Sequence, residues 1–295
     1  MIQNNKSLWM DFEDLKLYLQ NKTILVATQE NGGANQLLSF LDTVICDARI
    51  WRLFPSKNSR INQRYSEISE SYILESLRSF DVIIVAASVD NRESQTQFLS
   101  RLVENSRIPL FLFLDSWLNF KERIENVKYS ALIVSDKFAY SYAKEVASEN
   151  DPVLMVEDCE STLLRRSYRP SLPSSNILLL ETRPDDFSVG AIHPHGLECF
   201  CYYAESLLKK FKTKKLIYRR HPSISLNGCH YFLDKNPHIE ISQNHQLVED
   251  LNRSNSVFGK PSRALYLADT LGLETMRLCD VNKNWHGPHF NRVDL

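Results

Sequence analysis

The chain has 295 residues, 43% of them hydrophobic, and a formal net charge of −1. This length and hydrophobicity suffice for one large globular domain or two of ordinary size. The near-neutral charge excludes an overall basic field of the kind that attracts nucleic acid, so we expect no nucleic-acid partner.

The cysteines and the N-terminus indicate a reducing compartment. The six cysteines form no Cys-x-x-Cys pair and no histidine stands at zinc-finger spacing, which argues against a disulfide framework and a structural metal site. The sequence has no signal-peptide pattern and no run approaching the roughly 18 apolar residues of a membrane span. We therefore expect a cytoplasmic protein, with peripheral association at the inner face of the membrane as a further hypothesis. The sequence carries no signal for an oligomeric state.

The first half of the chain alternates between strands and helices. An amphipathic helix is predicted over 7–19. Strands are predicted at 23–28, 43–46, 81–87, 110–114 and 131–135, and helices at 35–41, 73–79, 93–104, 120–125 and 137–149. Strands separated by roughly ten to fifteen helical residues are typical of βαβ units around a parallel sheet. We therefore predict a Rossmann-like N-terminal acceptor domain over 1–160.

A glycine pair follows the first predicted strand, in Glu30-Asn31-Gly32-Gly33-Ala34. Glycines at a strand-to-helix turn let the backbone approach a ligand, although the full G-x-G-x-x-G fingerprint is absent. We assign Asn31, Gly32 and Gly33 to the acceptor side of a substrate site. The alternative is a tight turn that needs positive φ.

A carboxylate follows the buried strand predicted at 110–114. Asp115 would emerge at the carboxyl edge of the sheet, where it can act as a general base on a sugar hydroxyl. Glu30, expected to leave a neighbouring strand of the same edge, is a second candidate base. The alternative is that Asp115 only caps the helix that follows.

Between residues 158 and 175 the alternation fades into polar, proline-containing sequence, which predicts an interdomain linker at 161–175. A second α/β series follows, with strands at 176–181, 215–218, 239–242, 256–259 and 275–278 and helices at 196–211, 246–254 and 262–271. We predict a C-terminal Rossmann-like donor domain over 176–295. The expected fold is α/β, with two Rossmann-like domains facing each other across a cleft.

The strand predicted at 215–218 leads into Arg219-Arg220-His221-Pro222. Pro222 restricts the preceding backbone to an extended form, which sets the direction of His221. A positioned histidine and an arginine such as Arg220 suit a phosphate group through charge-assisted hydrogen bonds. Because side chains alternate across a sheet, the alternative is that one of the two arginines forms a salt bridge instead.

Further phosphate contacts are predicted from two loops. Ser262 and Lys260 belong to Gly259-Lys260-Pro261-Ser262, a strand-to-helix turn where a hydroxyl and helix N–H groups can meet an anion; simple N-capping is the alternative for Ser262. Arg183 lies on the loop ahead of the long helix predicted at 196–211. His193 and His195 on this loop have no third metal ligand at recognisable spacing, so we expect a polar wall and no metal.

These motifs resemble those of bacterial GT-B glycosyltransferases, particularly the sialyltransferase-like and Kdo-transferase-like enzymes that use CMP-sugars. Arg220-His221-Pro222 is similar to their HP motif, which contacts the nucleotide phosphate and assists the departure of CMP. Gly259-Lys260-Pro261-Ser262-Arg263-Ala264-Leu265 resembles their phosphate-binding serine motif. Leu114-Asp115-Ser116-Trp117 resembles the acidic motif that carries the base, with Ser116 and Trp117 in place of its second acid and glycine.

The resemblance implies an inverting, metal-independent glycosyltransferase that moves a sugar onto a surface polysaccharide or glycolipid, as in lipopolysaccharide. The donor would be a nucleotide-sugar cosubstrate, such as CMP-linked sialic acid or Kdo, with no other cofactor. A nucleotide-sugar 2-epimerase or a polyol-phosphate transferase is the enzymatic alternative. A third hypothesis is a non-catalytic subunit of a polysaccharide assembly complex. In the related superfamily a glutamate that binds the ribose follows Ser-x-Ala-Leu shortly, and here Leu265-Tyr266-Leu267 offers no acid at that place. Asp269 is the candidate substitute.

Overall fold

The computed structural model describes residues 12–28, 31–52, 65–87, 95–115, 117, 119–149, 151–171, 176–181, 196–213, 215–221, 234–277 and 286–292. The chain divides into two compact units, Met1–Glu160 and Ser161–Leu295, here unit 1 and unit 2. None of the helices in the described segments combines the length and hydrophobicity of a membrane span.

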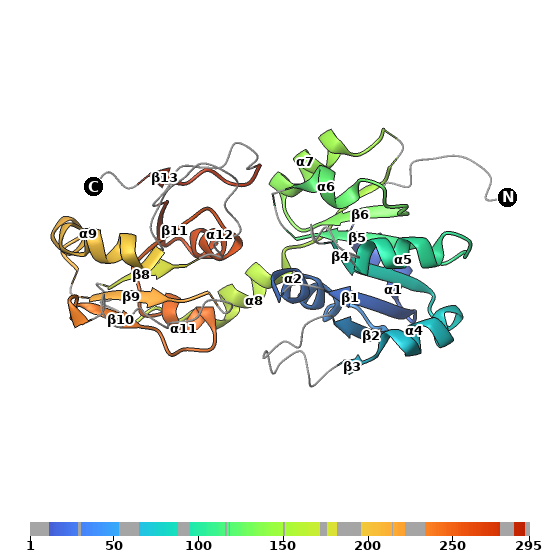
Figure 1. The fold of residues 1–295 in the computed structure, drawn as a ribbon, viewed down its shortest axis with the longest axis horizontal. Helices are drawn as coiled ribbons and strands as arrows, with labels where there is room; N and C mark the ends of the chain where they lie inside the picture. The colour runs from blue at the N-terminus through green and yellow to red at the C-terminus, as the bar shows by residue number, and fades with distance from the viewer. Residues whose placement is uncertain are drawn as a thin grey trace. The chain divides into compact units, whose positions relative to one another are not determined.

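Unit 1 is built on a parallel sheet covered by helices (Figure 1). Across the described residues the strand order is β3-β2-β1-β4-β5-β6-β7, and every neighbouring pair is parallel. The strands are β1 (Thr23–Thr28), β2 (Asp47–Arg52), β3 (Ser66–Glu67), β4 (Val82–Ala86), β5 (Leu110–Leu114), β6 (Ala131–Val134) and β7 (Val153–Met155). The helices are α1 (Phe12–Leu19), α2 (Asn31–Leu41), α4 (Glu70–Ser76), α5 (Gln95–Val103), α6 (Phe120–Ile124) and α7 (Lys137–Val146), with a 3₁₀ turn η1 (Leu77–Ser79).

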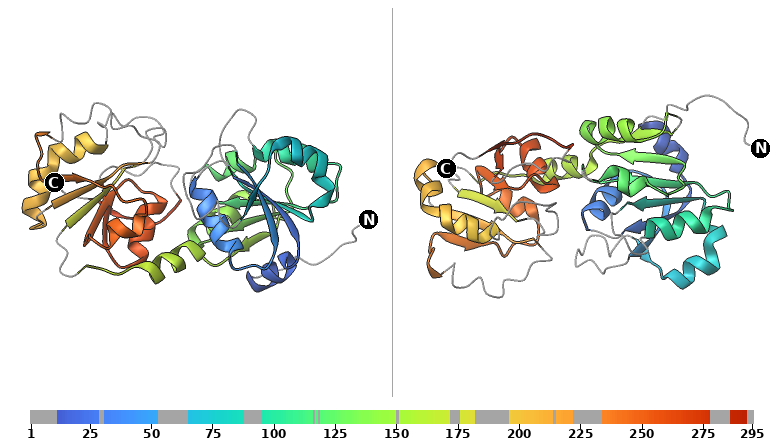
Figure 2. Two further views of the ribbon diagram at one scale, coloured as in Figure 1. Left: turned by 90° about the horizontal axis from the view of Figure 1, so that it is seen from below. Right: turned by 45° about the horizontal axis from the view of Figure 1, so that its top comes forward.

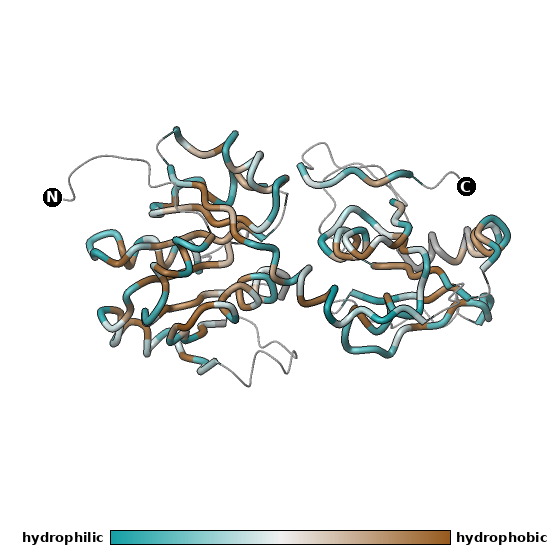
Figure 3. Tube along the Cα trace, turned by 180° about the vertical axis from the view of Figure 1, so that it is seen from behind, coloured by the Kyte–Doolittle hydropathy of each residue, from teal (hydrophilic) through white to brown (hydrophobic). Residues whose placement is uncertain are grey.

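The central strands of unit 1 are continuous apolar runs. Every residue of β4 and β5 is buried, as are the last five residues of β1. Such runs arise where both faces of a parallel sheet are covered, because no position along the strand faces water. In Figure 3 the strands are coloured as hydrophobic inside a more hydrophilic surface.

Two elements of unit 1 differ from the sequence prediction. The strand predicted at 43–46 is wrong, since the chain turns there and β2 begins at Asp47, paired with Thr23. The charged side chains of Asp47 and Arg49 interrupt the apolar pattern that would predict β2, which lies next to the edge strand β3. Helix α2 begins at Asn31 instead of Asn35, so both glycines of the motif lie inside it.

Unit 2 repeats the plan with strands in the order β10-β9-β8-β11-β12-β13, again all parallel. The strands are β8 (Asn176–Leu180), β9 (Lys215–Arg219), β10 (Ile239–Ile241), β11 (Ser256–Gly259), β12 (Glu274–Arg277) and β13 (Asn291–Arg292). The helices α9 (Gly196–Lys210), α11 (Leu247–Leu251) and α12 (Arg263–Thr270) cover it, and α8 (Cys159–Ser167) occupies much of the segment expected as a linker. The left panel of Figure 2 shows α9 and α12 on opposite faces of this sheet.

Both sheets have the strand order of a Rossmann fold. The first strand of each unit lies inside the sheet; the chain steps outward on one side and then returns to the other side of that strand. Ligands bind to such sheets at the carboxyl ends of the strands, where the direction of winding reverses. This point lies between β1 and β4 in unit 1 and between β8 and β11 in unit 2.

Candidate functional site

The two arginines at the end of β9 have different environments. Arg219 forms an ion pair with Asp250 of α11, with 2.5 Å between Nη1 and Oδ2, and its side chain is 20% exposed. Arg220, the next residue, is exposed. The alternation expected from the sequence therefore separates a half-buried arginine that forms an ion pair from one that is exposed at the carboxyl edge.

His221 is half-buried directly after Arg220, at the carboxyl end of β9. Strand β9 pairs with β8, and β11 pairs with the other side of β8. The Arg220-His221 segment and the turn after β11 therefore leave strands on either side of the same central strand. Unit 2 thus brings both predicted phosphate motifs to one edge of its sheet.

The turn after β11 depends on a close approach of two strands. Gly259 is in register with Leu180 of β8, and a Cβ at Gly259 would lie 2.9 Å from the carbonyl oxygen of Leu180. A larger residue would push β11 away from β8 at the point where the winding reverses. Gly259 therefore sets the spacing at this edge.

Ser262 is the N-cap of α12, as the alternative interpretation held. Its Oγ accepts a hydrogen bond from the N–H of Leu265 at 3.3 Å, with extended backbone (φ −158°). The first N–H groups of a helix have no acceptor inside the helix, so a capped N-terminus still presents donors. Lys260 is half-buried in the same turn.

Glu181 also lies at this edge, although the sequence motifs did not single it out. It follows β8, its N–H donates to the carbonyl oxygen of Arg219 at 3.0 Å, and its carboxylate accepts a hydrogen bond from the phenol of Tyr218. Tyr218 is 1% exposed. The sequence did contain a signal for Glu181, because it directly follows the apolar strand β8 and so lies at the carboxyl edge of the sheet.

In unit 1, Asp115 follows β5 and forms a buried ion pair. Its Oδ1 lies 2.5 Å from Nη1 of Arg123 on α6, and the two side chains are 9% and 7% exposed. The same nitrogen donates to the carbonyl oxygen of Ala87 after β4 at 2.6 Å. The sequence interpretation missed Arg123. Residues three apart lie on the same face of a helix, so Arg123 shares the buried face of Phe120 on α6, and a buried guanidinium needs an acidic partner.

A chain of buried polar contacts fixes the backbone at Asp115. The side-chain amide of Gln36 on α2 donates to the carbonyl oxygen of Asp115 at 2.8 Å. The hydroxyl of Ser135, after β6, donates in turn to the side-chain oxygen Oε1 of Gln36 at 3.0 Å. Gln36 and Ser135 are themselves 4% and 6% exposed, so this chain of largely buried hydrogen bonds ties α2 to two strand ends.

Gly33 is required by packing and not by a turn. It lies in the first turn of α2, and a Cβ there would lie 2.7 Å from Oδ2 of Asp115 and 2.9 Å from Cβ of Ala86. The hypothesis of a turn with positive φ is therefore wrong for Gly33. The helix approaches the sheet closely at the switch point between β1 and β4, and only a residue without a side chain fits.

We expect Gly33→Ala to lower the free energy of unfolding by about 1–3 kcal/mol, as overpacking does. The carboxylate of Asp115 cannot easily move aside, because Arg123 holds it. Urea unfolding would measure the change, with Ser39→Ala on the same helix as a control that stays within about 0.5 kcal/mol. A gain in stability would show that Asp115 yields and that helix propensity dominates.

Several predicted residues lie outside the described residues: Glu30, Pro222, Arg183, His193 and His195, and also the side chain of Asn31. The expectation that Glu30 and Asp115 leave neighbouring strands is wrong, because β4 lies between β1 and β5. Strands β2 and β3 lie on one side of β1, and β4 and then β5 lie on the other side. In the segments that the structure describes, no group of three or more His, Cys, Asp or Glu side chains could hold a metal ion.

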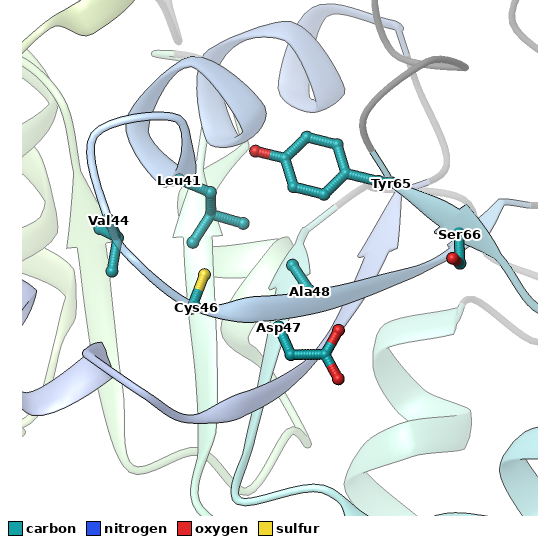
Figure 4. A pocket seen from close by; sticks show the side chains of 7 residues that line it. All are labelled: Leu41, Val44, Cys46, Asp47, Ala48, Tyr65 and Ser66. Carbon is teal, nitrogen blue, oxygen red and sulfur yellow. The ribbon is translucent and has the colours of Figure 1, made fainter.

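A small hollow lies elsewhere in unit 1 (Figure 4). Its volume is about 110 Å³, and it is lined by Leu41, Val44, Cys46, Asp47, Ala48, Tyr65 and Ser66. Small-molecule sites usually measure roughly 300–1,000 Å³. The hollow lies beside the amino end of β2, away from the carboxyl edge, so we assign it no substrate.

No protein-family model matches the sequence, and no curated protein matches it. Solved structures do share its fold. UDP-GlcNAc 2-epimerase from Neisseria meningitidis bound to UDP-GlcNAc is 12% identical, with a TM-score of 0.61 over 88% of this chain and 83% of the other. A glycosyltransferase from Rickettsia africae ESF-5 is 12% identical (TM-score 0.54, 87% and 79%), and the wall teichoic acid polymerase TagF is 9% identical (0.54, 92% and 75%).

At these identities the comparison shows the fold. The chain has a GT-B-type fold, and the prediction of two Rossmann-like domains is confirmed. Its structural neighbours include both glycosyltransferases and sugar-nucleotide epimerases. The predicted CMP-sugar group remains a prediction.

Proposed function

We propose that the protein is an enzyme that acts on a nucleotide-sugar, with the nucleotide phosphate bound at the carboxyl edge of the unit 2 sheet. The observation that carries this proposal is the position of the Arg220-His221 segment and the Gly259–Ser262 turn on either side of β8. A cationic side chain, an imidazole and the capped N-terminus of α12 are the groups that stabilise a phosphate. The fold shared with nucleotide-sugar enzymes agrees with it.

Within this proposal we favour an inverting glycosyl transfer without a metal ion. His221 and Arg220 would offset the negative charge that grows on the departing phosphate, which removes the need for a divalent cation. Asp115 or Glu30 would deprotonate the acceptor hydroxyl. The acceptor would be a surface polysaccharide or a glycolipid, met in the cytoplasm or at the inner face of the membrane.

Epimerisation is the second candidate. It is favoured by the fold similarity to UDP-GlcNAc 2-epimerase, whose TM-score of 0.61 exceeds that of the glycosyltransferase and the polymerase. The two reactions differ in what unit 1 must do, since only transfer requires a binding site for an acceptor. The HP-like motif favours CMP as the nucleotide, whereas an epimerase would be expected to bind UDP.

Calorimetric titration of the full chain with CMP, CDP and UDP, each in the presence and absence of EDTA, tests the proposal. We expect saturable binding of one nucleotide, unaffected by EDTA, and loss of affinity in Ser262→Ala. Binding of CMP would support the glycosyltransferase with a CMP donor, and binding of UDP would favour the epimerase. No binding of any of the three would contradict both enzymatic proposals.

A further inference from the structure

Arg219 connects β9 to the turn between β10 and α11. Besides Asp250, its guanidinium donates to three consecutive carbonyl oxygens, those of Asn244 at 3.1 Å, His245 at 3.0 Å and Gln246 at 3.3 Å. Five N–H donors in a rigid plane can serve several acceptors at once, which a lysine cannot do. The side chain of Arg219 therefore holds the backbone of three successive residues of this turn in place.

Asp250 anchors the same turn from the helix side. Its side chain is fully buried and accepts hydrogen bonds from Ser242 Oγ at 2.7 Å and from Asn244 Nδ2 at 2.7 Å. The first residue of the turn is also tied to the sheet, because the N–H of Ser242 donates to the carbonyl oxygen of Tyr218 at 2.8 Å. Residues 242–246 are thus held at several points, and each of these contacts is made by Tyr218 or Arg219 at the end of β9 or by Asp250, which is paired with Arg219.

The backbone of Arg219 is held on the opposite side as well. Its carbonyl oxygen accepts the N–H of Glu181, at the end of β8. The last residue of β9 is therefore fixed by its side chain toward α11 and by its main chain toward β8. Arg220 and His221 continue the chain directly from this doubly anchored residue.

We infer that Arg219 is a positioning residue for the phosphate site. It holds the 242–246 turn against the end of β9 and so sets the direction in which Arg220 and His221 leave the strand. This inference rests on the proposed function for its ligand, an anionic nucleotide. The two neighbouring arginines then have separate roles: Arg220 binds the ligand, and Arg219 holds the 242–246 turn against the end of β9.

The test compares Arg219→Lys with Arg253→Lys. The lysine at 219 keeps a positive charge for Asp250 but cannot serve three carbonyl oxygens as well. Arg253 forms a matched ion pair with Glu240 at 2.6 Å, with side chains 38% and 32% exposed, and its hydrogen bond lowers the pKa of Glu240. Neither member of the control pair follows the carboxyl end of a strand.

Two measurements on the full chain are needed: amide hydrogen exchange, and titration with CMP, CDP and UDP. In Arg219→Lys we expect faster exchange at 220–221 and 242–246. We also expect roughly tenfold weaker binding of the nucleotide that the wild type binds, the scale of one lost hydrogen bond to the ligand. Arg253→Lys should match the wild type in both. Should Arg219→Lys fail to fold, Ser242→Ala loosens the same turn while keeping the ion pair, and smaller changes of the same kind are expected.

Unchanged exchange at these segments overturns the inference, even where binding weakens, because Arg219 would then contact the ligand itself. Faster exchange with unchanged binding overturns it too, since the turn would not support the site. If the wild type binds none of the three nucleotides, the proposed function fails, and the inference fails with it for lack of a ligand. If the wild type binds a nucleotide, and exchange and binding change in Arg219→Lys but not in Arg253→Lys, the proposed function and the role of Arg219 are both supported.

Discussion

Replacing His221 with alanine is expected to lower turnover of the nucleotide-sugar by about 10²–10⁴-fold, the usual contribution of a positioned proton-transfer group. His221 is half-buried after β9, and a neutral methyl group there can neither donate a proton nor offset charge on the departing phosphate. Nucleotide binding should weaken as well. Because His221 follows the strand and is not part of the apolar core, unfolding by urea should change little.

His238→Ala is the matched control for His221→Ala. His238 is exposed at the amino end of the unit 2 sheet, and its carbonyl oxygen, which alanine retains, accepts the N–H of Leu216. We expect wild-type turnover and binding from this variant. Turnover that is unchanged in His221→Ala would refute the assigned role, whereas equal losses in both variants would indicate a general effect on unit 2.

Removing the carboxylate of Asp115 is expected to be the most destabilising of the substitutions considered. Asp115→Ala leaves Arg123 as a buried charge without its acid, which typically costs about 3–5 kcal/mol. Asp115→Asn keeps an oxygen for the guanidinium and should cost less. Urea unfolding of both variants measures the difference, and the double variant Asp115→Ala/Arg123→Met should recover part of the loss.

The asparagine variant also separates the two roles proposed for Asp115. As a general base, Asp115 requires an ionised carboxylate, so Asp115→Asn should lose turnover while nucleotide binding persists. Full turnover in Asp115→Asn, together with a large loss of stability in Asp115→Ala, would make Asp115 a structural residue. Glu30 would then remain as the candidate base.

Much of the fold could be predicted because apolar strands and helical segments alternate. Strands β1, β4, β5 and β11 were found within a residue or so of their predicted positions. Strand β2 was missed because it carries the charges of Asp47 and Arg49, which a strand next to the edge strand β3 tolerates. Helix α8 was missed because its sequence, Cys159–Ser167, is polar.

The candidate site was predicted only in part. His221 and Ser262 follow apolar strands within a few residues, and in a parallel sheet this suffices to place them at the carboxyl edge. The residues that hold Arg219 and Asp115 in place carried no such signal. Asp250 lies 31 residues from Arg219, and Gln36 lies 79 residues from Asp115.

The sequence by itself determined the class of fold and the edge of each sheet that carries polar groups, because the period of hydrophobic residues is a local property. The tertiary structure alone decided which of two adjacent arginines forms the ion pair with Asp250, and that Gly33 serves packing and not a turn. These depend on how closely α11 and α2 approach their sheets. Such approaches are set by contacts between residues far apart in the chain, which no local pattern records.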